Sequence, residues 1–87
     1  IESIVSVKDY LCIKVQKDLH IHRCTMKEIE TLLDPQNFIR IHRSHIVNLK
    51  LITKIELSNE NRLIHTVQGN SHPISRRYLK KIKQYIA

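Results

Sequence analysis

The sequence predicts a single, mainly β domain with two short helices. Most of the chain consists of short runs rich in Ile, Val and Leu that are separated by polar turn signals, and this pattern is typical of strands. Two segments, residues 26–33 and 76–86, change to the helical period instead. A length of 87 residues suits one domain and is too short for two, so residues 1–87 are interpreted as one domain.

The expected strands alternate with turns that contain Lys, Asp, Asn, Ser or Gly. Lys8-Asp9 and Lys17-Asp18 are the first two turn candidates, so the chain is expected to turn back on itself at both places. Later turns are expected at residues 58–61 and 68–70. The strands are expected at residues 1–7, 10–15, 19–23, 38–42, 52–57 and 62–68, with a short piece around residues 72–74.

The first helix is expected to begin at a capping box. Thr25 as N-cap and Glu28 three residues later can each satisfy a backbone amide that lacks a helical partner. Asp34-Pro35 then ends the helix, because the residue before a proline avoids the helical conformation. The apolar residues that share one face of this helix are Met26, Ile29, Leu32 and Leu33.

The second helix is expected at residues 76–86, with Ser75 as its N-cap. One arc of this helix is apolar and is predicted to face the core; it consists of Tyr78, Leu79, Ile82, Tyr85 and Ile86. The opposite arc is polar and carries Arg76, Arg77, Lys80, Lys81, Lys83 and Gln84. This basic arc either contacts an anionic partner or is simply solvated.

The charge of the chain favours a polyanionic partner. Fifteen Lys and Arg against eight Asp and Glu give a net charge of +7, which favours nucleic acid, an anionic membrane or an acidic protein. The basic residues of residues 35–55 and of residues 61–87 have no acidic residue among them. A merely solvated surface usually mixes both signs, so we expect a real binding site for a polyanion.

Targeting signals and cysteines add little to this interpretation. No apolar run reaches the roughly 20 residues needed to span a bilayer, and no signal peptide is visible. Ile1 is not an initiator Met, so we expect a domain of a longer protein. Cys12 and Cys24 match no zinc or disulfide pattern and are expected to be free, partly buried thiols in the cytoplasm.

Catalytic and metal-binding motifs are not found in the sequence. A single Gly does not allow the Gly-rich loops of nucleotide-binding motifs, and no nucleophile or paired-carboxylate pattern is present. His20 and His22 alternate on one strand, and His42 and His45 lie close together in sequence, but no Cys or carboxylate shares their spacing. We therefore expect surface histidines, no cofactor, no metal and no enzymatic activity.

The most informative stretch is residues 38–48. In a strand, Ile39 and Ile41 point inward while Arg40 and His42 point outward. A continuing strand would bury Arg43, and an unpaired guanidinium is too costly to bury. The chain must therefore leave the sheet near residues 42–44, where Arg43 either projects for recognition of guanine or phosphate or pairs with a carboxylate.

This stretch also resembles a known family. The sequence Phe-Ile-Arg-Ile-His-Arg-Ser-His-Ile-Val-Asn at residues 38–48, followed by Ile-Ser-Arg-Arg-Tyr at residues 74–78, is similar to the LytTR DNA-binding domain family. The order of the predicted elements agrees, and the resemblance covers essentially all 87 residues. It implies an elongated, mainly antiparallel β fold that places loops, rather than a recognition helix, in the grooves of DNA.

The resemblance also implies roles for particular residues. Arg43, Arg77 and Tyr10 correspond to base-reading positions, although Lys8 could serve in place of Tyr10. The residues expected to hold phosphates or to shape the loops are Arg40, His42, Ser44, Asn48, Ser75 and Arg76. Lys8, Lys80 and Lys83 complete the set of expected phosphate contacts, the last two acting as sequence-independent point charges.

We therefore predict a sequence-specific DNA-binding domain of a bacterial transcription regulator, joined to a receiver domain of a two-component system. We expect the isolated domain to be a monomer and two copies to bind promoter repeats, because the apolar residues are expected to be used up by core faces. The alternative is a basic interaction module that binds anionic lipid, acidic protein or RNA. The scarcity of aromatic residues argues against RNA, since aromatic side chains commonly stack on its bases.

Overall fold

Two antiparallel sheets and two helices make up the fold in the computed structural model, which describes residues 1–86. The first sheet has the order β3-β2-β1-β5-β4 and contains β1 (Ser3–Val7), β2 (Tyr10–Val15), β3 (Asp18–His22), β4 (Phe38–His42) and β5 (His45–Asn48). The second contains β6 (Ile52–Leu57), β7 (Arg62–Thr66) and β8 (Ser71–Pro73). The helices are α1 (Met26–Leu32) and α2 (Leu79–Ile86), with short 3-10 turns η1 (Leu49–Leu51), η2 (Val67–Gly69) and η3 (Arg76–Tyr78).

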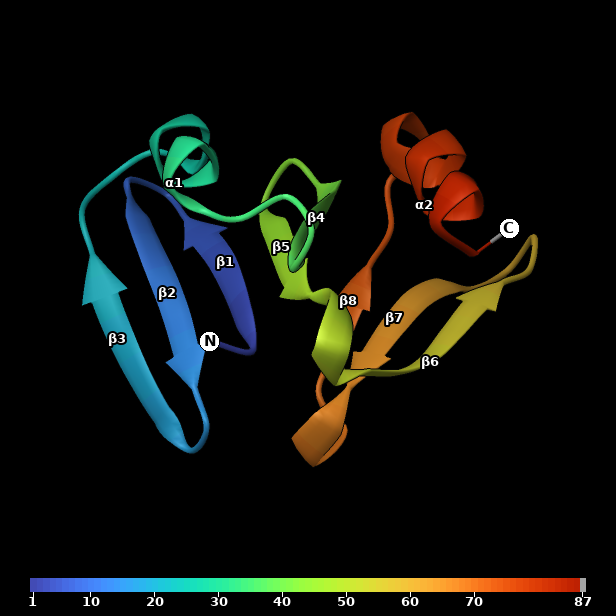
Figure 1. Cartoon of the computed structure of the whole chain (residues 1–87), viewed down its shortest axis with the longest axis horizontal. Helices are drawn as coiled ribbons and strands as arrows, with labels where there is room; N and C mark the ends of the chain where they lie inside the picture. Colours follow the sequence, from blue (N-terminus) through green and yellow to red (C-terminus); the bar gives the residue numbers. More distant parts are fainter. Residues whose placement is uncertain (87) are drawn as a thin grey trace.

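This architecture confirms the predicted fold class. Neighbouring strands pair antiparallel in both sheets, and the molecule measures 33 × 25 × 24 Å along its principal axes. Figure 1 shows the two sheets side by side, with α1 above the first sheet and α2 above the second. Neither helix has the length and apolarity needed to cross a bilayer, a statement that covers residues 1–86.

Strand boundaries differ from the predictions by one or two residues. The second turn lies at Gln16-Lys17 rather than Lys17-Asp18, because Val15 pairs with Asp18 across the hairpin. Gln16 adopts a φ of +55° there, a conformation that sequence patterns do not favour for a residue other than Gly. The first strand begins at Ser3 instead of residue 1, and β7 ends at Thr66 instead of residue 68.

The strand β5 was not predicted, and it lies near the centre of the structure. It pairs with β1 on one side and with β4 on the other. Ile46 and Val47 are both buried, one on each face of the sheet. An alternating polar and apolar pattern marks only strands with one exposed face, so the four residues of β5 carried no periodic signal.

Two hydrophobic cores lie on either side of the β4–β5 hairpin. Ile4, Leu11, Met26 and Ile46 form the core between the first sheet and α1. The second core joins the opposite face of the hairpin to the second sheet and α2; its buried members are Ile39, Ile41, Val47, Ile64, Ile74 and Ile82. The predicted inward positions of Ile39 and Ile41 are thereby confirmed.

The predicted N-cap at Thr25 is confirmed, but the capping box is only half formed, because the Glu28 carboxylate bonds the Thr25 hydroxyl and not the Thr25 amide. The hydroxyl of Thr25 accepts a hydrogen bond from the Glu28 amide at 3.1 Å and donates one to the Glu28 carboxylate at 3.0 Å. Met26 is buried against the sheet, and Ile29 and Leu33 pack around it. The predicted apolar face is wrong for Leu32, which is 79% exposed, because the helix ends there and Leu33 leaves it in an extended conformation.

The second helix is also only partly as predicted. Its first turn, η3, is a 3-10 turn, and regular α-helix begins at Leu79. Ser75 occupies the N-cap position, but its hydroxyl makes no capping hydrogen bond. Ile82 is buried, whereas Tyr85 and Ile86 are 50% and 52% exposed, so their predicted place in the core is wrong. The core ends at Ile82, and the last turn of α2 extends beyond it.

Some apolar surface remains uncovered, contrary to the expectation that the cores use all of it. Every residue of β3 is exposed, with Leu19 and Ile21 at 60% and 63%. Ile21 pairs with Cys12, and Cys12 pairs with Val5, so these residues share the face of the first sheet that lies away from α1. Because α1 covers only one face of this sheet, the part of the other face at β3 is left open.

The unequal burial within α2 gives a prediction about stability. Ile82→Ala should lower the free energy of unfolding by about 2–5 kcal/mol, because it leaves a cavity in the second core. Ile86→Ala makes the same chemical change at an exposed position and should stay within about 0.5 kcal/mol of the wild-type value. Urea denaturation measures both. Equal losses in the two variants would show that the end of α2 is packed as tightly as its middle.

Candidate nucleic-acid interface

The three segments that carry the predicted base-reading residues Tyr10, Arg43 and Arg77 meet at one edge of the molecule. The amide of Ser6, before the β1–β2 turn, donates to the Ser44 carbonyl in the β4–β5 turn at 2.9 Å. The amide of Ser75, before η3, donates to the Ile41 carbonyl at the end of β4 at 3.0 Å. Figure 1 shows the two turns and the start of the η3–α2 segment along the upper edge. Backbone hydrogen bonds therefore join segments that are far apart in sequence.

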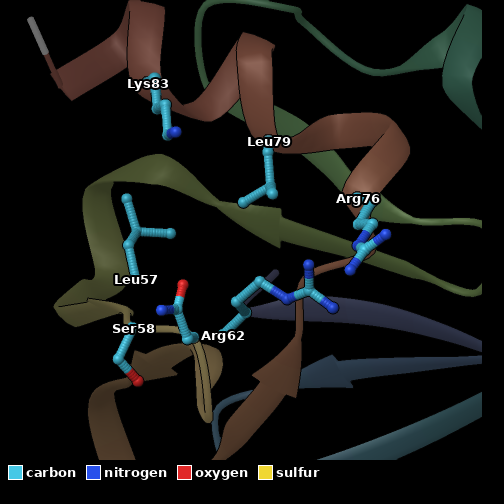
Figure 2. Close-up of a pocket in the computed structure, with 7 residues that line it drawn as sticks. Leu57, Ser58, Arg62, Arg76, Leu79 and Lys83 are labelled. Carbon is cyan, nitrogen blue, oxygen red and sulfur yellow. The ribbon is translucent and has the colours of Figure 1, made fainter.

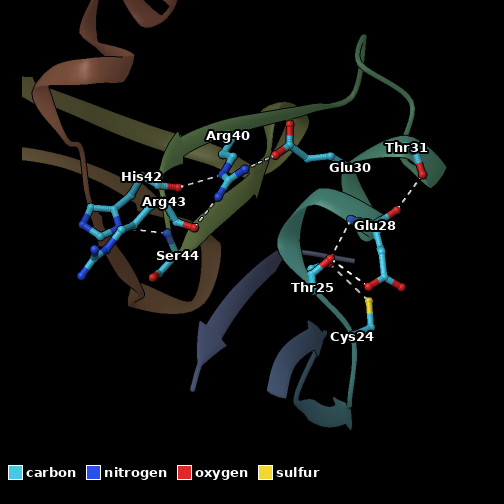
Figure 3. Close-up of polar contacts among 9 residues, drawn as sticks. All are labelled: Cys24, Thr25, Glu28, Glu30, Thr31, Arg40, His42, Arg43 and Ser44. Atoms are coloured by element: carbon cyan, nitrogen blue, oxygen red, sulfur yellow. Dashed lines mark hydrogen bonds and ion pairs between the residues drawn. The ribbon is translucent and has the colours of Figure 1, made fainter. Parts of the chain in front are cut away.

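The β4–β5 turn is held in shape by the side chain of Arg40. Its Nε donates to the His42 carbonyl at 3.3 Å and its Nη2 to the Arg43 carbonyl at 2.6 Å, while Nη1 forms an ion pair with Glu30 of α1 (Figure 3). On the other side of the turn, Nδ1 of His42 accepts from the Ser44 amide at 3.0 Å. Arg40 and His42 thus shape the turn from inside the protein.

Arg43 is left projecting from this turn. Its carbonyl is bonded by Arg40, but its own side chain is exposed. Among residues 1–86 no carboxylate lies within ion-pair distance of its guanidinium, and the arginine that pairs with an acid is Arg40. The predicted exit from the sheet at residues 42–44 is confirmed, and a β-bulge between Arg40 and His42 accompanies it.

Arg77 projects from the neighbouring segment. It is exposed, and its guanidinium carbon lies 5.9 Å from the centre of the Tyr78 ring. The guanidinium carbon of Arg40 in β4 lies at the same distance from that ring, so the Tyr78 ring lies near Arg40 as well as near Arg77. A cation near an aromatic face is attracted to it, which limits the freedom of Arg77 without removing it from solvent.

The β1–β2 turn places Lys8 and Tyr10 at the same edge. Lys8 has a φ of +55°, a backbone conformation that is uncommon for residues with a side chain. Tyr10 is 48% exposed and lines a shallow apolar hollow with Val7, Cys12 and Ile21. Lys8 therefore lies in the turn itself, whereas Tyr10 opens onto the uncovered face of the first sheet.

Asn48 is a predicted site residue that the structure places away from this edge. It ends β5, at the opposite end of the strand from the Arg43 turn. Its side chain accepts from the Lys50 amide at 2.9 Å and donates to the Ile1 carbonyl at 2.8 Å. Asn48 thus caps η1 and holds the first residue of the chain through a hydrogen bond.

Basic residues also line a hollow beside α2 (Figure 2). Arg62 of β7, Arg76 of η3 and Lys83 of α2 border a space of about 310 Å³, with Ser58 and Asn59 of the β6–β7 turn also lining it. None of the three cations has a carboxylate partner among residues 1–86. Arg62 was not predicted as a site residue, because only strand pairing brings it beside η3, through the bond from the Ile74 amide to its carbonyl at 3.0 Å.

A chain of histidines runs inward from the Arg43 turn. The ring of His42 packs edge-on against His45 with 5.1 Å between centroids, and His45 packs against His72 of β8 at 5.2 Å. The Nδ1 atoms of His45 and His72 are 3.0 Å apart. Burial lowers the pKa of His45 to about 4, helped by the charges of His72 and His42. Burial also lowers the pKa of His72.

These histidines do not form a recognisable metal site. Within the part of the chain that the structure describes, no three His, Cys, Asp or Glu side chains are arranged to hold a metal ion. His20 and His22 are exposed on β3 and lie apart from the other histidines in the sheet order. Cys12 and Cys24 are partly buried free thiols.

Comparison with known proteins identifies the family. The sequence profile of the LytTr DNA-binding domain matches residues 1–87. The chain belongs to the LytTR family of DNA-binding domains. A solved LytTr DNA-binding domain of a Bacillus cereus response regulator has the same fold, with a TM-score of 0.90 and 24% sequence identity over all of this chain and 81% of that one.

Relatives that contain a similar LytTR domain are longer proteins. An uncharacterised response regulatory protein of Vibrio parahaemolyticus is 39% identical over 64 residues, which is 71% of this chain and 26% of the relative. The sensory transduction protein LytT of Bacillus cereus is 30% identical over 75 residues, which is 85% of this chain and 30% of the relative. The chain thus spans less than a third of either protein.

The buried histidines give a prediction about pH. The pKa of His45 is lower in the folded protein, about 4, than its ordinary value of 6.5, so the unfolded chain binds more protons between these values. The free energy of unfolding should therefore fall as pH decreases from 6.5 to 4, by at most about 1.4 kcal/mol per pH unit for each such histidine, and by less because His45 is partly exposed.

Replacing His45 and His72 together by Leu tests this. Urea denaturation across the same pH range should give a shallower pH dependence for the double variant. His20→Leu/His22→Leu, on exposed β3, is the matched control and should leave the wild-type dependence unchanged. The same slope in the wild type and the His45→Leu/His72→Leu variant would show that other groups cause the acid destabilisation.

Proposed function

We propose that this LytTR domain reads promoter DNA in the major groove with Arg43 and Arg77. The observation that carries the proposal is the placement of two exposed arginines, both without a carboxylate partner among residues 1–86, on adjoining segments of one edge. The bond between the Ser75 amide and the Ile41 carbonyl holds these segments together. A guanidinium fork can bind O6 and N7 of guanine with two hydrogen bonds.

The surrounding residues favour recognition by preorganisation. Arg40 and His42 hold the turn backbone, and Tyr78 restrains Arg77. Side chains and loops that are already ordered lose less conformational entropy on binding. Tyr10 is proposed as a third base-contacting residue at the end of the edge, where its exposed ring could contact a thymine methyl group.

The phosphate backbone is proposed to contact the other basic and hydroxyl groups of this edge. These are Lys8, Ser44, Ser75, Arg76, Lys80 and Lys83, together with Arg62. Such contacts position a protein on the duplex without reading its sequence. Asn48 is not included, because both of its side-chain polar atoms are engaged at the far end of β5.

We also propose that residues 1–87 are the output domain of a longer two-component response regulator with a receiver domain. The support is that relatives described as response regulatory or sensory transduction proteins are more than three times longer than their match to this chain. Such a regulator would act in the cytoplasm on promoter DNA. Its LytTR domain would need no metal or cofactor and would not be an enzyme.

Binding to anionic lipid is less well supported than DNA binding. An interfacial helix must bury its apolar face in the membrane, but Ile82 of α2 is already buried, with Tyr78 and Leu79 packed against the same core. Only Tyr85 and Ile86 of the predicted apolar arc remain exposed. Binding to an acidic protein or to RNA is supported only by the net positive charge of the chain. DNA binding is also supported by membership of the LytTR family.

The base-reading roles give a direct prediction. Arg43→Ala and Arg77→Ala should each lower the preference for a selected duplex over a random duplex, by about 1–3 kcal/mol for each lost two-bond contact. A duplex selected by the wild-type domain from a random pool and gel-shift titrations provide the measurement. Lys17→Ala, in the β2–β3 turn at the far end of the strands, is the control. Equal losses on both duplexes would mean that the arginines hold only phosphates.

The assembly of the domain is a separate prediction. We expect a monomer in solution and two copies on half-sites spaced by whole helical turns, about 34–36 Å or a multiple. The uncovered surface at β3 is the feature that argues most strongly against a monomer, because exposed Leu19 and Ile21 offer apolar surface for self-association. Sedimentation of the free domain and gel shifts on one and two half-sites check it. A stable dimer without DNA would contradict the prediction.

A further inference from the structure

The two halves of the domain are joined by few directional contacts. Within the described part of the chain, three hydrogen bonds connect residues 1–48 with residues 52–86. They run from the Ser75 amide to the Ile41 carbonyl at 3.0 Å, from Asn70 Nδ2 to Glu2 Oε2 at 2.8 Å, and between the Nδ1 atoms of His45 and His72 at 3.0 Å. We call the boundary between these two halves the seam. Its remaining contacts are mostly those of apolar side chains in the second core.

Apolar packing constrains the relative position of the two sheets less narrowly than hydrogen bonds do. Hydrophobic contact is non-directional, so the halves could shift slightly at small cost. Hydrogen bonds have narrow ranges of distance and angle, so the three cross-seam bonds set the position of one half relative to the other. Only one of the three, between His45 and His72, joins a β-strand of one sheet directly to a β-strand of the other through side chains.

This histidine pair is close in sequence to both proposed base-reading segments. His45 directly follows Ser44 of the Arg43 turn, and His72 lies three residues before Ser75, which begins the Arg77 segment. His45 also packs against the ring of His42, whose Nδ1 accepts from the Ser44 amide. A shift between His45 and His72 would therefore change the spacing between the two arginines.

The environment of the pair keeps it in the bonded form at neutral pH. His72 is 5% exposed, and burial lowers the pKa of both rings. The charged or titratable groups that influence the pair are His42, Glu2 and Lys14. Two neutral imidazoles facing each other through Nδ1 must adopt complementary tautomers, one donating and one accepting. The pair then makes one directional bond without a buried charge.

We propose that His45 and His72 are positioning residues for DNA reading, which hold the Arg43 turn and the Arg77 segment at the spacing required to engage one duplex together. This inference rests on the proposed role of the two arginines. The histidines themselves are not proposed to contact DNA: they act through the seam that joins the two sheets.

The test compares variants that remove the bond with variants that keep it. His45→Leu/His72→Leu replaces both partners by apolar groups, which avoids leaving one buried polar atom unpaired. His45→Asn and His72→Asn keep a hydrogen-bonding atom near the Nδ1 position. His20→Leu/His22→Leu makes the same double change on exposed β3 and is the matched control. If the first double variant does not fold, His45→Phe/His72→Leu replaces it and keeps one ring against His42.

The measurement is the affinity ratio between a duplex selected by the wild-type domain and a random duplex, with urea unfolding as the check of folding. This affinity ratio should be at least tenfold lower for folded His45→Leu/His72→Leu than for the wild type, which corresponds to about 1.4 kcal/mol. At least one Asn variant and the β3 control should keep the wild-type ratio. Hydrogen exchange of the Ser75 amide should be faster in the Leu variant, because the seam is looser.

The outcomes separate the inference from the function on which it rests. If the wild-type domain selects no duplex, the proposed function fails before the histidines are tested. If it selects one and the folded Leu variant keeps the same ratio, the positioning role is wrong. Loss of the ratio in both Asn variants as well as in the Leu variant would also overturn it, because ring packing rather than the hydrogen bond would then be responsible.

Discussion

The β4–β5 hairpin is buried on both faces, and the rest of the structure depends on this constraint. Ile39, Ile41 and Val47 pack into the core under the second sheet and α2, while Ile46 packs into the core under α1. A chain of 87 residues has limited apolar surface with which to stabilise two sheets. Sharing one hairpin between two cores makes the two halves a single packing unit, because neither core is complete without it.

The same constraint explains why the interface lies where it does. A hairpin enclosed by two cores can expose only its turn, and the arginine next to that turn must be paired if it is partly buried. Arg40 satisfies this requirement with Glu30 and with the carbonyls of His42 and Arg43. These bonds hold the turn backbone, and Arg43 is the side chain that projects from it.

The helices serve this arrangement in different ways. α1 supplies Glu30 to the turn and covers one face of the first sheet, which leaves Leu19 and Ile21 on the opposite face exposed. α2 gives Ile82 to the second core and presents its basic residues outward. The edge itself is built from turns and the start of η3, which backbone hydrogen bonds hold together.

The sequence by itself determined the features that depend on local period and on the cost of burying charge. These include both helices, the N-cap at Thr25, most strands, and the exit of Arg43 from the sheet, while the family resemblance pointed to the loops of the interface. Tertiary structure alone decided the strand β5, the exposure of Leu32, Tyr85 and Ile86, the place of Arg62 beside η3, and the contact between His45 and His72. The physical reason is that a strand buried on both faces has no alternating pattern, and that contacts across the seam join residues distant in sequence, whose proximity no local period records.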